Sequence, residues 1–293
     1  MLIGGAALEG PIHFYNGEIT LWFDRAKWKY YRLEKNGKYT PIGGVTTPVH
    51  IIDKSDVLTP WAAKMVVQKA IRLFEDARKA ESERGSLLNF EYEEILRNAQ
   101  TAPRDKLEEA GNVGTQAHQK IEALILYAIT FTKGIVEFKG FGDEKDHDPR
   151  VVSCVKAALD WMSEHKVKWL QTERKVYSRL YDYAGTMDGL CLVDGKVSVA
   201  DWKTSNGLYP EYCYQTAAYQ HAYQEETGET IADRWILRLG KEDAEFDPWH
   251  LPGQGLFDQD FKIFRLCQDL SAQHKVVKAR MAPKKRKKSS EEK

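Results

Sequence analysis

Short-period alternation of hydrophobic and polar residues marks the strands of this chain. Residues 11–45 hold aromatic and β-branched runs separated by Asn-Gly and Asp-Arg pairs, which predicts several short strands. Residues 168–179 alternate in the same way and lead into a hairpin within residues 185–203. Residues 231–239 and 244–250 predict one more hairpin. We interpret residues 11–45 mainly as scaffold, a small sheet added to the main domain.

Apolar residues at helical spacing predict the helices. Thr59 and Pro60 should begin the first, because threonine caps a helix and proline suits its first turn. The predicted helices cover residues 59–79, 90–98, 103–131, 151–166, 210–226 and 257–280. The expected buried positions are Trp61, Met65, Ala70 and Leu73 in the first helix and Val113, Ala117, Ile121, Leu124 and Ala128 in the third.

Composition limits the class of protein. The 293 residues are 42% hydrophobic and 29% charged, which is ordinary for a soluble globular protein. The 43 basic and 43 acidic residues cancel, so any attraction to nucleic acid must be local. The four scattered cysteines argue against a zinc ribbon, a clustered iron–sulfur site and a secreted disulfide scaffold, and favour a reducing compartment. We expect no signal peptide and no membrane span.

The hairpin within residues 185–203 is the most informative segment. Asp194-Gly195 is a strong two-residue turn signal, because both positions need a positive φ. Counting outward from that turn places Asp188 opposite Asp201, with Cβ atoms roughly 5 Å apart on one side of the sheet. Two carboxylates so close repel each other unless a cation lies between them. A divalent metal ion fits, because hard cations prefer oxygen ligands.

Lys203 completes the pattern on the second strand. It lies two residues beyond Asp201 and shares its face, whereas Trp202 points away. An acidic residue two positions before a lysine is a weak signal alone, since residues 143–145, 194–196 and 260–262 also fit. Only Asp201 both ends an apolar strand and has a facing aspartate, which favours a metal site.

Other candidate positions carry a structural alternative. His118 lies beside the apolar stripe of its helix, where a packed core histidine is commoner than a ligand, and Gly114 one turn earlier indicates a close approach to the backbone. Glu173 either faces the same site or is a solvated strand residue. Gln215 and Tyr219 belong to a tyrosine-rich helical stripe that either packs in the core or projects toward a phosphate or base.

Two peripheral features have open interpretations. Trp28, Lys29 and Tyr30 are either scaffold or a face that steers a nucleic-acid strand. Five consecutive positive charges run from Lys284 to Lys288 in a low-complexity tail that we expect to be disordered. This tail is a solvated segment, a phosphate contact, or a signal read by nuclear import.

The order of these motifs resembles the PD-(D/E)xK nuclease superfamily, and more narrowly its RecB-like exonuclease branch, which includes groups similar to phage recombination exonucleases and the mitochondrial genome maintenance exonuclease. The resemblance covers about residues 37–225, and segments 37–47 and 61–64 are similar to phage members. The motifs are Gly114-x-x-x-His118, Glu173, Gly185-x-x-Asp188, Asp201-Trp202-Lys203 and Gln215-x-x-x-Tyr219.

The resemblance implies an α/β (α+β) fold with a central mixed β-sheet flanked by helices, the restriction-endonuclease-like core. We expect an N-terminal β-rich extension at residues 1–45, a nuclease domain at residues 46–280 and a basic tail at residues 281–293. His118, Asp188, Asp201 and the Trp202 backbone carbonyl would bind metal, and Lys203 would be the catalytic lysine, with Asp188, Asp201 and Glu173 as catalytic carboxylates. Gln215 and Tyr219 would match the motif near the DNA strand.

The implied activity is a Mg²⁺-dependent DNA exonuclease, phage-encoded and serving recombination or replication. Mn²⁺ should substitute for Mg²⁺, because an imidazole ligand tolerates it well. We expect no iron–sulfur cluster and no ATP-driven unwinding. Lys203 would either orient the attacking water and offset charge or, with its pKa lowered by the nearby metal, accept a proton. The alternatives are a structure-selective or restriction-type endonuclease and a non-catalytic DNA-binding protein.

Partners and location follow from that activity. DNA ends, single- or double-stranded, would be the substrate, with a recombination or single-strand-binding protein as a further partner and no membrane association. The expected location is the cytoplasm of a bacterial host, or the nucleus if the basic tail is an import signal. The residues do not indicate an oligomeric state.

Overall fold

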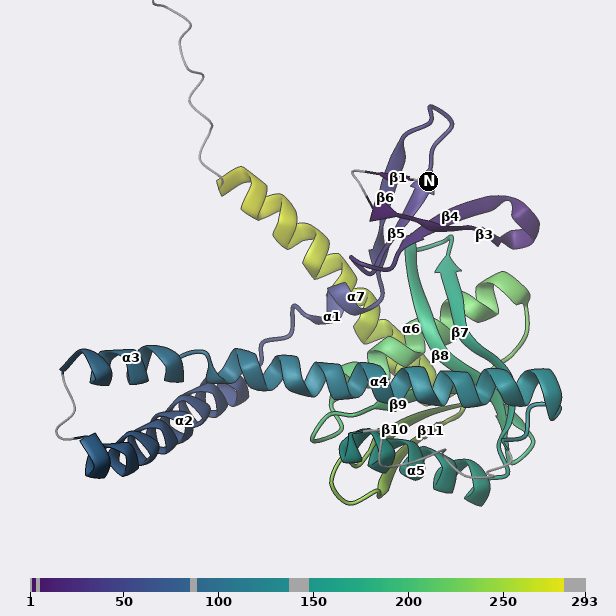
Figure 1. The fold of residues 1–293 in the computed structure, drawn as a ribbon. Helices are drawn as coiled ribbons and strands as arrows, with labels where there is room; N and C mark the ends of the chain where they lie inside the picture. Colours follow the sequence, from purple (N-terminus) through teal and green to yellow (C-terminus); the bar gives the residue numbers. More distant parts are fainter. Residues whose placement is uncertain (1, 4–5, 85–88, 137–147, 282–293) are drawn as a thin grey trace, which may run out of the picture.

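The chain folds around one central sheet with helices on both faces (Figure 1). We describe residues 2–3, 6–84, 89–136 and 148–281 of a computed structural model. The predicted basic tail from Lys284 to Lys288 and residues 137–147 lie outside the described residues. In the described part of the chain, no helix combines the length and apolarity that crossing a bilayer needs.

The central sheet is mixed and contains nine of the described strands. Its order is β11-β10-β9-β8-β6-β5-β4-β3, and β7 also pairs with β8. Pairing is parallel between β9 and β10 and between β6 and β8, and antiparallel elsewhere. The strands are β3 (Glu9–Phe14), β4 (Ile19–Asp24), β5 (Lys29–Leu33), β6 (Tyr39–Gly44), β7 (Lys168–Ser178), β8 (Tyr183–Val193), β9 (Lys196–Lys203), β10 (Asp233–Leu239) and β11 (Phe246–Pro252). A separate pair is formed by β1 (Leu2–Ile3) and β2 (Ala6–Ala7), and a 3-10 turn η1 (Tyr15–Gly17) follows β3.

The two largest hydrophobic cores lie between the sheet and its helices. One core joins α4 and α5 to the sheet and contains Trp161, Trp169 and Trp202. The other joins α1, α6 and α7 to the opposite face and contains Val199 and Phe264. The helices are α1 (Thr46–Val49), α2 (Ser55–Arg84), α3 (Asn89–Ala99), α4 (Ala102–Phe131), α5 (Pro149–Glu164), α6 (Pro210–Thr227) and α7 (Gly253–Met281). The predicted fold class, a mixed sheet between helices, is confirmed.

The register of β8 and β9 agrees with the predicted hairpin. Val193 pairs with Lys196 across the Asp194-Gly195 turn, where Asp194 has a φ of 48° and Gly195 a φ of 82°. The last paired residues are Gly189 and Ala200, one step before the two aspartates. Trp202 lies in the core with Trp161 and Trp169, away from the face of its neighbour Asp201, as strand alternation requires.

The N-terminal strands extend the main sheet rather than forming one of their own. Gly43 and Gly44 of β6 pair in parallel with Tyr183 and Ala184 of β8. A small core of aromatic and aliphatic side chains covers one side of these strands and includes Tyr177 of β7. The strands therefore stand beside the hairpin that carries the candidate site.

The structure corrects the start and the packing of the first long helix. It begins at Ser55, where Asp53 accepts hydrogen bonds from the Ser55 backbone and hydroxyl, so Pro60 lies inside the helix rather than at its start. Its predicted buried residues Trp61, Met65, Ala70 and Leu73 are only half-buried. The reason is visible in Figure 1, where α2 and α3 extend away from the sheet beside the N-terminal half of α4.

In α4 the predicted stripe is nearly right. Val113, Ala117, Ile121 and Ala128 are buried, but Ile125 takes the buried position predicted for Leu124.

Candidate active site

Asp188 lies where β8 and β9 stop pairing. Beyond the Gly189–Ala200 pair, Oδ2 of Asp188 accepts a hydrogen bond of 2.9 Å from the Trp202 backbone N–H. The carboxylate thus accepts a hydrogen bond from the β9 backbone just beyond the last backbone pair, and it holds the ends of β8 and β9 together. Burial raises the pKa of Asp188, while the charge of Lys203 works in the opposite direction.

Asp201 is the most deeply buried charged group of the site, with 1% of its surface exposed. Its Oδ2 lies 2.6 Å from the Lys203 ammonium, and no other group of the described structure donates a hydrogen bond to it. Burial raises the pKa of Asp201 to about 6, with Lys203 lowering it and Asp188 raising it further. A desolvated carboxylate is costly unless a cation compensates it, and Lys203 supplies that positive charge here.

Lys203 lies among the acidic and polar groups predicted to share its face. Its ammonium contacts Asp201, donates a 3.3 Å hydrogen bond to Oε1 of Gln215 and lies 4.8 Å from the ring centre of Tyr212. Burial acts to lower its pKa, but Asp201 and Asp188 outweigh burial, so the pKa is raised. This raised pKa describes the metal-free chain. The lowering expected beside a bound metal ion stays a prediction.

Gln215 and Tyr219 extend this network into α6. The Gln215 amide donates a 2.7 Å hydrogen bond to the Tyr219 hydroxyl while its carbonyl accepts from Lys203. Tyr219 is buried, which raises its pKa and keeps the phenol neutral. These residues position the lysine; the DNA contact expected for them stays a prediction.

His118 approaches the carboxylates from α4. Its Nδ1 lies 3.7 Å from Oδ2 of Asp188. Burial and then the charge of Lys203 lower its pKa to about 4, although Asp201 and a hydrogen bond to the Trp202 backbone carbonyl act in the opposite direction. The imidazole is therefore neutral at pH 7, the form that can ligate a metal. His118 thus lies beside two of the other predicted metal donors, Asp188 and the Trp202 backbone carbonyl.

Glu173 faces the site from β7 and is not a solvated strand residue, the other interpretation of its sequence position. It lies between the Thr172–Gly189 and Arg174–Met187 pairs, opposite Asp188, and adopts a φ of 49°. Burial, then Asp188, raises its pKa to about 7. Glu122, one turn after His118 on α4, also lines the site and was missed, although its four-residue spacing from His118 was a usable signal.

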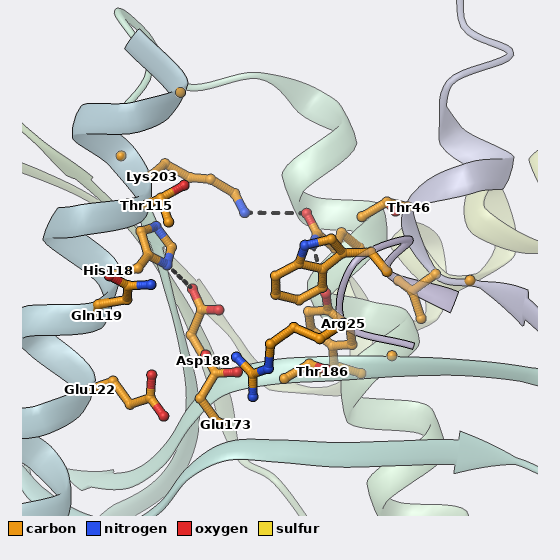
Figure 2. A pocket seen from close by; sticks show the side chains of 18 of the residues that line it. Arg25, Thr46, Thr115, His118, Gln119, Glu122, Glu173, Thr186, Asp188 and Lys203 are labelled. Atoms are coloured by element: carbon orange, nitrogen blue, oxygen red, sulfur yellow. Dashed lines mark hydrogen bonds and ion pairs between the residues drawn. The ribbon is translucent and has the colours of Figure 1, made fainter. Parts of the chain in front are cut away.

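A cavity of about 440 Å³ lies between the hairpin, α4, α6 and the N-terminal strands. The site residues that line it are Asp188, Lys203, His118, Glu122, Glu173, Gln215 and Tyr219, whereas the buried Asp201 is not part of its lining. Figure 2 shows His118 pointing toward Asp188, with Lys203 directed across the cavity toward α6. Glu122 and Glu173 lie on the side where Arg25 enters. Trp28, 64% exposed, also lines this cavity, so the N-terminal strands contribute to the site as well as to the scaffold.

The donor atoms suit a hard divalent cation. Asp188, Asp201, Glu173 and the Trp202 carbonyl offer oxygen, and His118 offers nitrogen. Among the described residues, however, no three His, Cys, Asp or Glu side chains already surround a common point as a metal shell. Lys203 holds the position nearest Asp201. The chemistry fits a metal, and the metal site stays a prediction.

Two motif glycines allow this close packing. A Cβ on Gly185 would lie 2.6 Å from Cε1 of Tyr219 and 2.8 Å from Cγ2 of Val45, and one on Gly114 would lie 2.7 Å from Oγ1 of Thr204. The close approach predicted at Gly114 is therefore present.

We expect Gly185→Ala to lower the free energy of unfolding by about 1–3 kcal/mol, because the added methyl group overpacks the Tyr219 ring. Urea titration measures this. The control is Gly111→Ala, where a Cβ would meet nothing within 4 Å and helix propensity predicts a gain of up to about 1 kcal/mol. Equal effects of the two substitutions would contradict the packing role.

Comparison with known proteins gives limited similarity. No family model and no curated protein matches the sequence. Among solved structures, an alkaline exonuclease (LHK-Exo) from Laribacter hongkongensis has a TM-score of 0.27 at 13% identity, covering 43% of this chain and 70% of that chain. LHK-Exo in complex with dAMP has a TM-score of 0.28 at 13% identity, with 59% and 97% covered. A protein named SSO0001 has a TM-score of 0.24 at 10% identity, with 52% and 75% covered. Similarity at this level carries no argument, and the functional proposal depends on the geometry of this chain.

Proposed function

We propose that this protein is a divalent-metal-dependent nuclease that hydrolyses DNA phosphodiester bonds as an exonuclease. One observation carries the proposal: Asp188, Asp201 and the Lys203 ammonium converge at the open end of one hairpin, with a neutral His118 beside them. Carboxylates that hold a cation next to a fixed ammonium are what phosphoryl chemistry needs, because the phosphate brings charge that must be neutralised.

Each residue has a distinct part in this proposal. Asp188, Asp201, His118 and the Trp202 carbonyl would hold Mg²⁺ or Mn²⁺. Glu173 would act on the same ion indirectly, through its electrostatic interaction with Asp188. A bound divalent cation supplies charge to the phosphate and makes a coordinated water more acidic. Lys203, kept protonated by its two carboxylates, would orient the attacking water and offset the charge that develops on the phosphate.

Gln215 and Tyr219 support the lysine rather than the reaction itself. Their hydrogen-bond chain fixes the ammonium on the side of the cavity facing α6. A fixed donor stabilises the transition state without reorganisation, which is why a positioned lysine serves better than a mobile one. The proposed biological setting is phage recombination or replication, suggested by the order of the motifs.

End-labelled linear DNA and closed circular DNA test the activity and its mode together. With Mg²⁺ or Mn²⁺, the protein should shorten linear single- or double-stranded DNA and leave circular DNA intact, because an exonuclease needs an end. Gel analysis of the labelled products measures both. Cutting of circular molecules would favour the endonuclease alternative, and binding without cleavage of any substrate would favour a non-catalytic DNA-binding protein.

A further inference from the structure

A second cavity of about 750 Å³ adjoins the candidate active site. It lies between α2, the N-terminal half of α4, the segment after β9 and the connection from β10 to β11. His118, Lys203 and Thr204 line both cavities, so the two form adjacent parts of one surface. A ligand that extends past Lys203 from the first cavity therefore enters the second.

The two cavities differ in charge. The first is lined by three carboxylates, Glu122, Glu173 and Asp188, against Arg25 and Lys203. The second is lined by the cations Lys106, Arg150, Lys203 and Lys241 against two carboxylates, Glu109 and Glu242. The acidic cavity suits a metal ion, and the basic one suits an anionic chain. This local contrast exists although the whole chain has no net charge.

Lys241 is the basic residue most available to a ligand. Lys106 and Arg150 both pair with Glu109, at 2.8 and 2.6 Å, and Arg150 also pairs with Asp148. Within the described part of the chain, Lys241 makes no ion pair, and burial lowers its pKa. A half-buried ammonium with no carboxylate partner gains most from an anion brought beside it.

Aromatic side chains line the same cavity. Trp61 enters from α2, and Tyr209 and Tyr212 enter from the start of α6. Tyr209 is 37% exposed, and its ring meets that of Tyr212 edge to face at 5.6 Å. Tyr212 is held in place by its hydrogen bond to Ser205 and by Lys203 over its ring.

Helix α2 is held against α4, so Trp61 is presented on a fixed support. Lys69 of α2 bonds Thr101 at 3.1 Å and Asp105 at 2.9 Å, one just before α4 and the other in its first turn. Trp61 is half-buried and lines the cavity, so part of its surface stays accessible to a ligand there. Aromatic side chains interleaved with cations are the recognised chemistry for unpaired nucleotides, since bases in a duplex already stack on each other.

We propose that the second cavity binds an unpaired DNA segment next to the scissile phosphate. Trp61 and Tyr209 stack on bases, and Lys241 and Lys106 contact phosphates. The choice of DNA as ligand rests on the proposed nuclease function, but binding in this cavity can be measured without cleavage.

Fluorescence anisotropy with a short fluorescein-labelled oligothymidylate, in Ca²⁺ and without turnover, tests the stacking. Trp61→Leu should weaken binding about 10-fold, because one stacked base is lost, while Trp61→Phe should stay within about 3-fold of wild type. Leucine retains the apolar packing of α2, so a purely structural role of Trp61 predicts no such difference. Trp61→Leu and Trp61→Phe should bind a blunt duplex of the same length with equal affinity.

Salt dependence tests the phosphate contact. Lys241→Gln should reduce the slope of log K against log salt concentration by about 0.7, the value for one phosphate contact on a single strand. The matched control is Lys262→Gln on α7, an exposed lysine that lines neither cavity and should leave the slope unchanged.

The outcomes separate the two proposals. Equal affinity of wild type, Trp61→Leu and Lys241→Gln would overturn the single-strand site even if the protein cleaves DNA. An equal loss for the duplex in Trp61→Leu would also overturn it, because an unpaired segment would not be required. The predicted losses without any cleavage by the wild type would support this site and contradict the nuclease.

Discussion

Replacing Lys203 by methionine should lower the rate of DNA cleavage by about 10²–10³-fold, the loss typical when one preorganised charge-stabilising donor is removed. The methionine side chain is similar in length and keeps the packing against Tyr212 while deleting the charge. The ammonium is the cation that lies between Asp201 and Gln215, and its raised pKa keeps it protonated at neutral pH. Single-turnover cleavage of end-labelled DNA in saturating Mg²⁺ measures the effect.

Lys262→Met provides the control for the loss of a lysine. That residue is exposed on α7 and should leave the rate unchanged. The Lys203 variant should still bind metal, because it retains Asp188, Asp201 and His118. Cleavage by Lys203→Met within about threefold of the wild type would show that the lysine has no part in the reaction.

Replacing Asp201 by asparagine should reduce cleavage by at least about 10³-fold, since several kcal/mol of metal-dependent stabilisation is lost. A second, activity-independent result is expected as well. Saturating Mn²⁺ or Mg²⁺ should raise the thermal midpoint of the wild type by about 5 °C, because ligand at 100 times its Kd adds about 2.7 kcal/mol. The Asp201 variant should lose this shift, and chelation with EDTA should abolish both shift and cleavage in the wild type.

Asp233→Asn is the matched control for removing a buried carboxylate. Asp233 is 6% exposed and bound by His250 at 3.0 Å and Lys196 at 3.4 Å, beside Ser198 near the opposite end of β9. It should keep the metal-dependent shift even if it is less stable. A shift that survives in Asp201→Asn, or that disappears equally in Asp233→Asn, would contradict metal binding at the hairpin.

The hairpin shows how far local pattern predicts this site. The Asp194-Gly195 turn fixes the register, and the two-residue period of a strand then fixes which side chains share a face. Asp188, Asp201 and Lys203 could therefore be grouped from the sequence, and Trp202 assigned to the core. Those inferences use only nearest-neighbour geometry, which needs no knowledge of the rest of the chain.

The helix α2 shows where local pattern fails. Its apolar positions resemble a buried stripe, but their side chains are only half-buried, because the helix extends beyond the sheet. Periodicity states which side of a helix is apolar and cannot state what covers it. The side facing α4 became part of a cavity wall, and the start of the helix was set by Asp53 rather than by Thr59 and Pro60.

The sequence by itself determined the strands of the central sheet, most of the helices, the hairpin register and the carboxylate–lysine pattern, because turn chemistry and side-chain periodicity act over a few residues. It did not predict the short strands β1 and β2. Only the tertiary structure decided that Glu173, Glu122 and His118 meet that hairpin, that two carboxylates raise the pKa of Lys203 in the metal-free chain, and that a basic aromatic cavity adjoins an acidic one. These outcomes depend on contacts between segments far apart in the chain, and on the burial those contacts create.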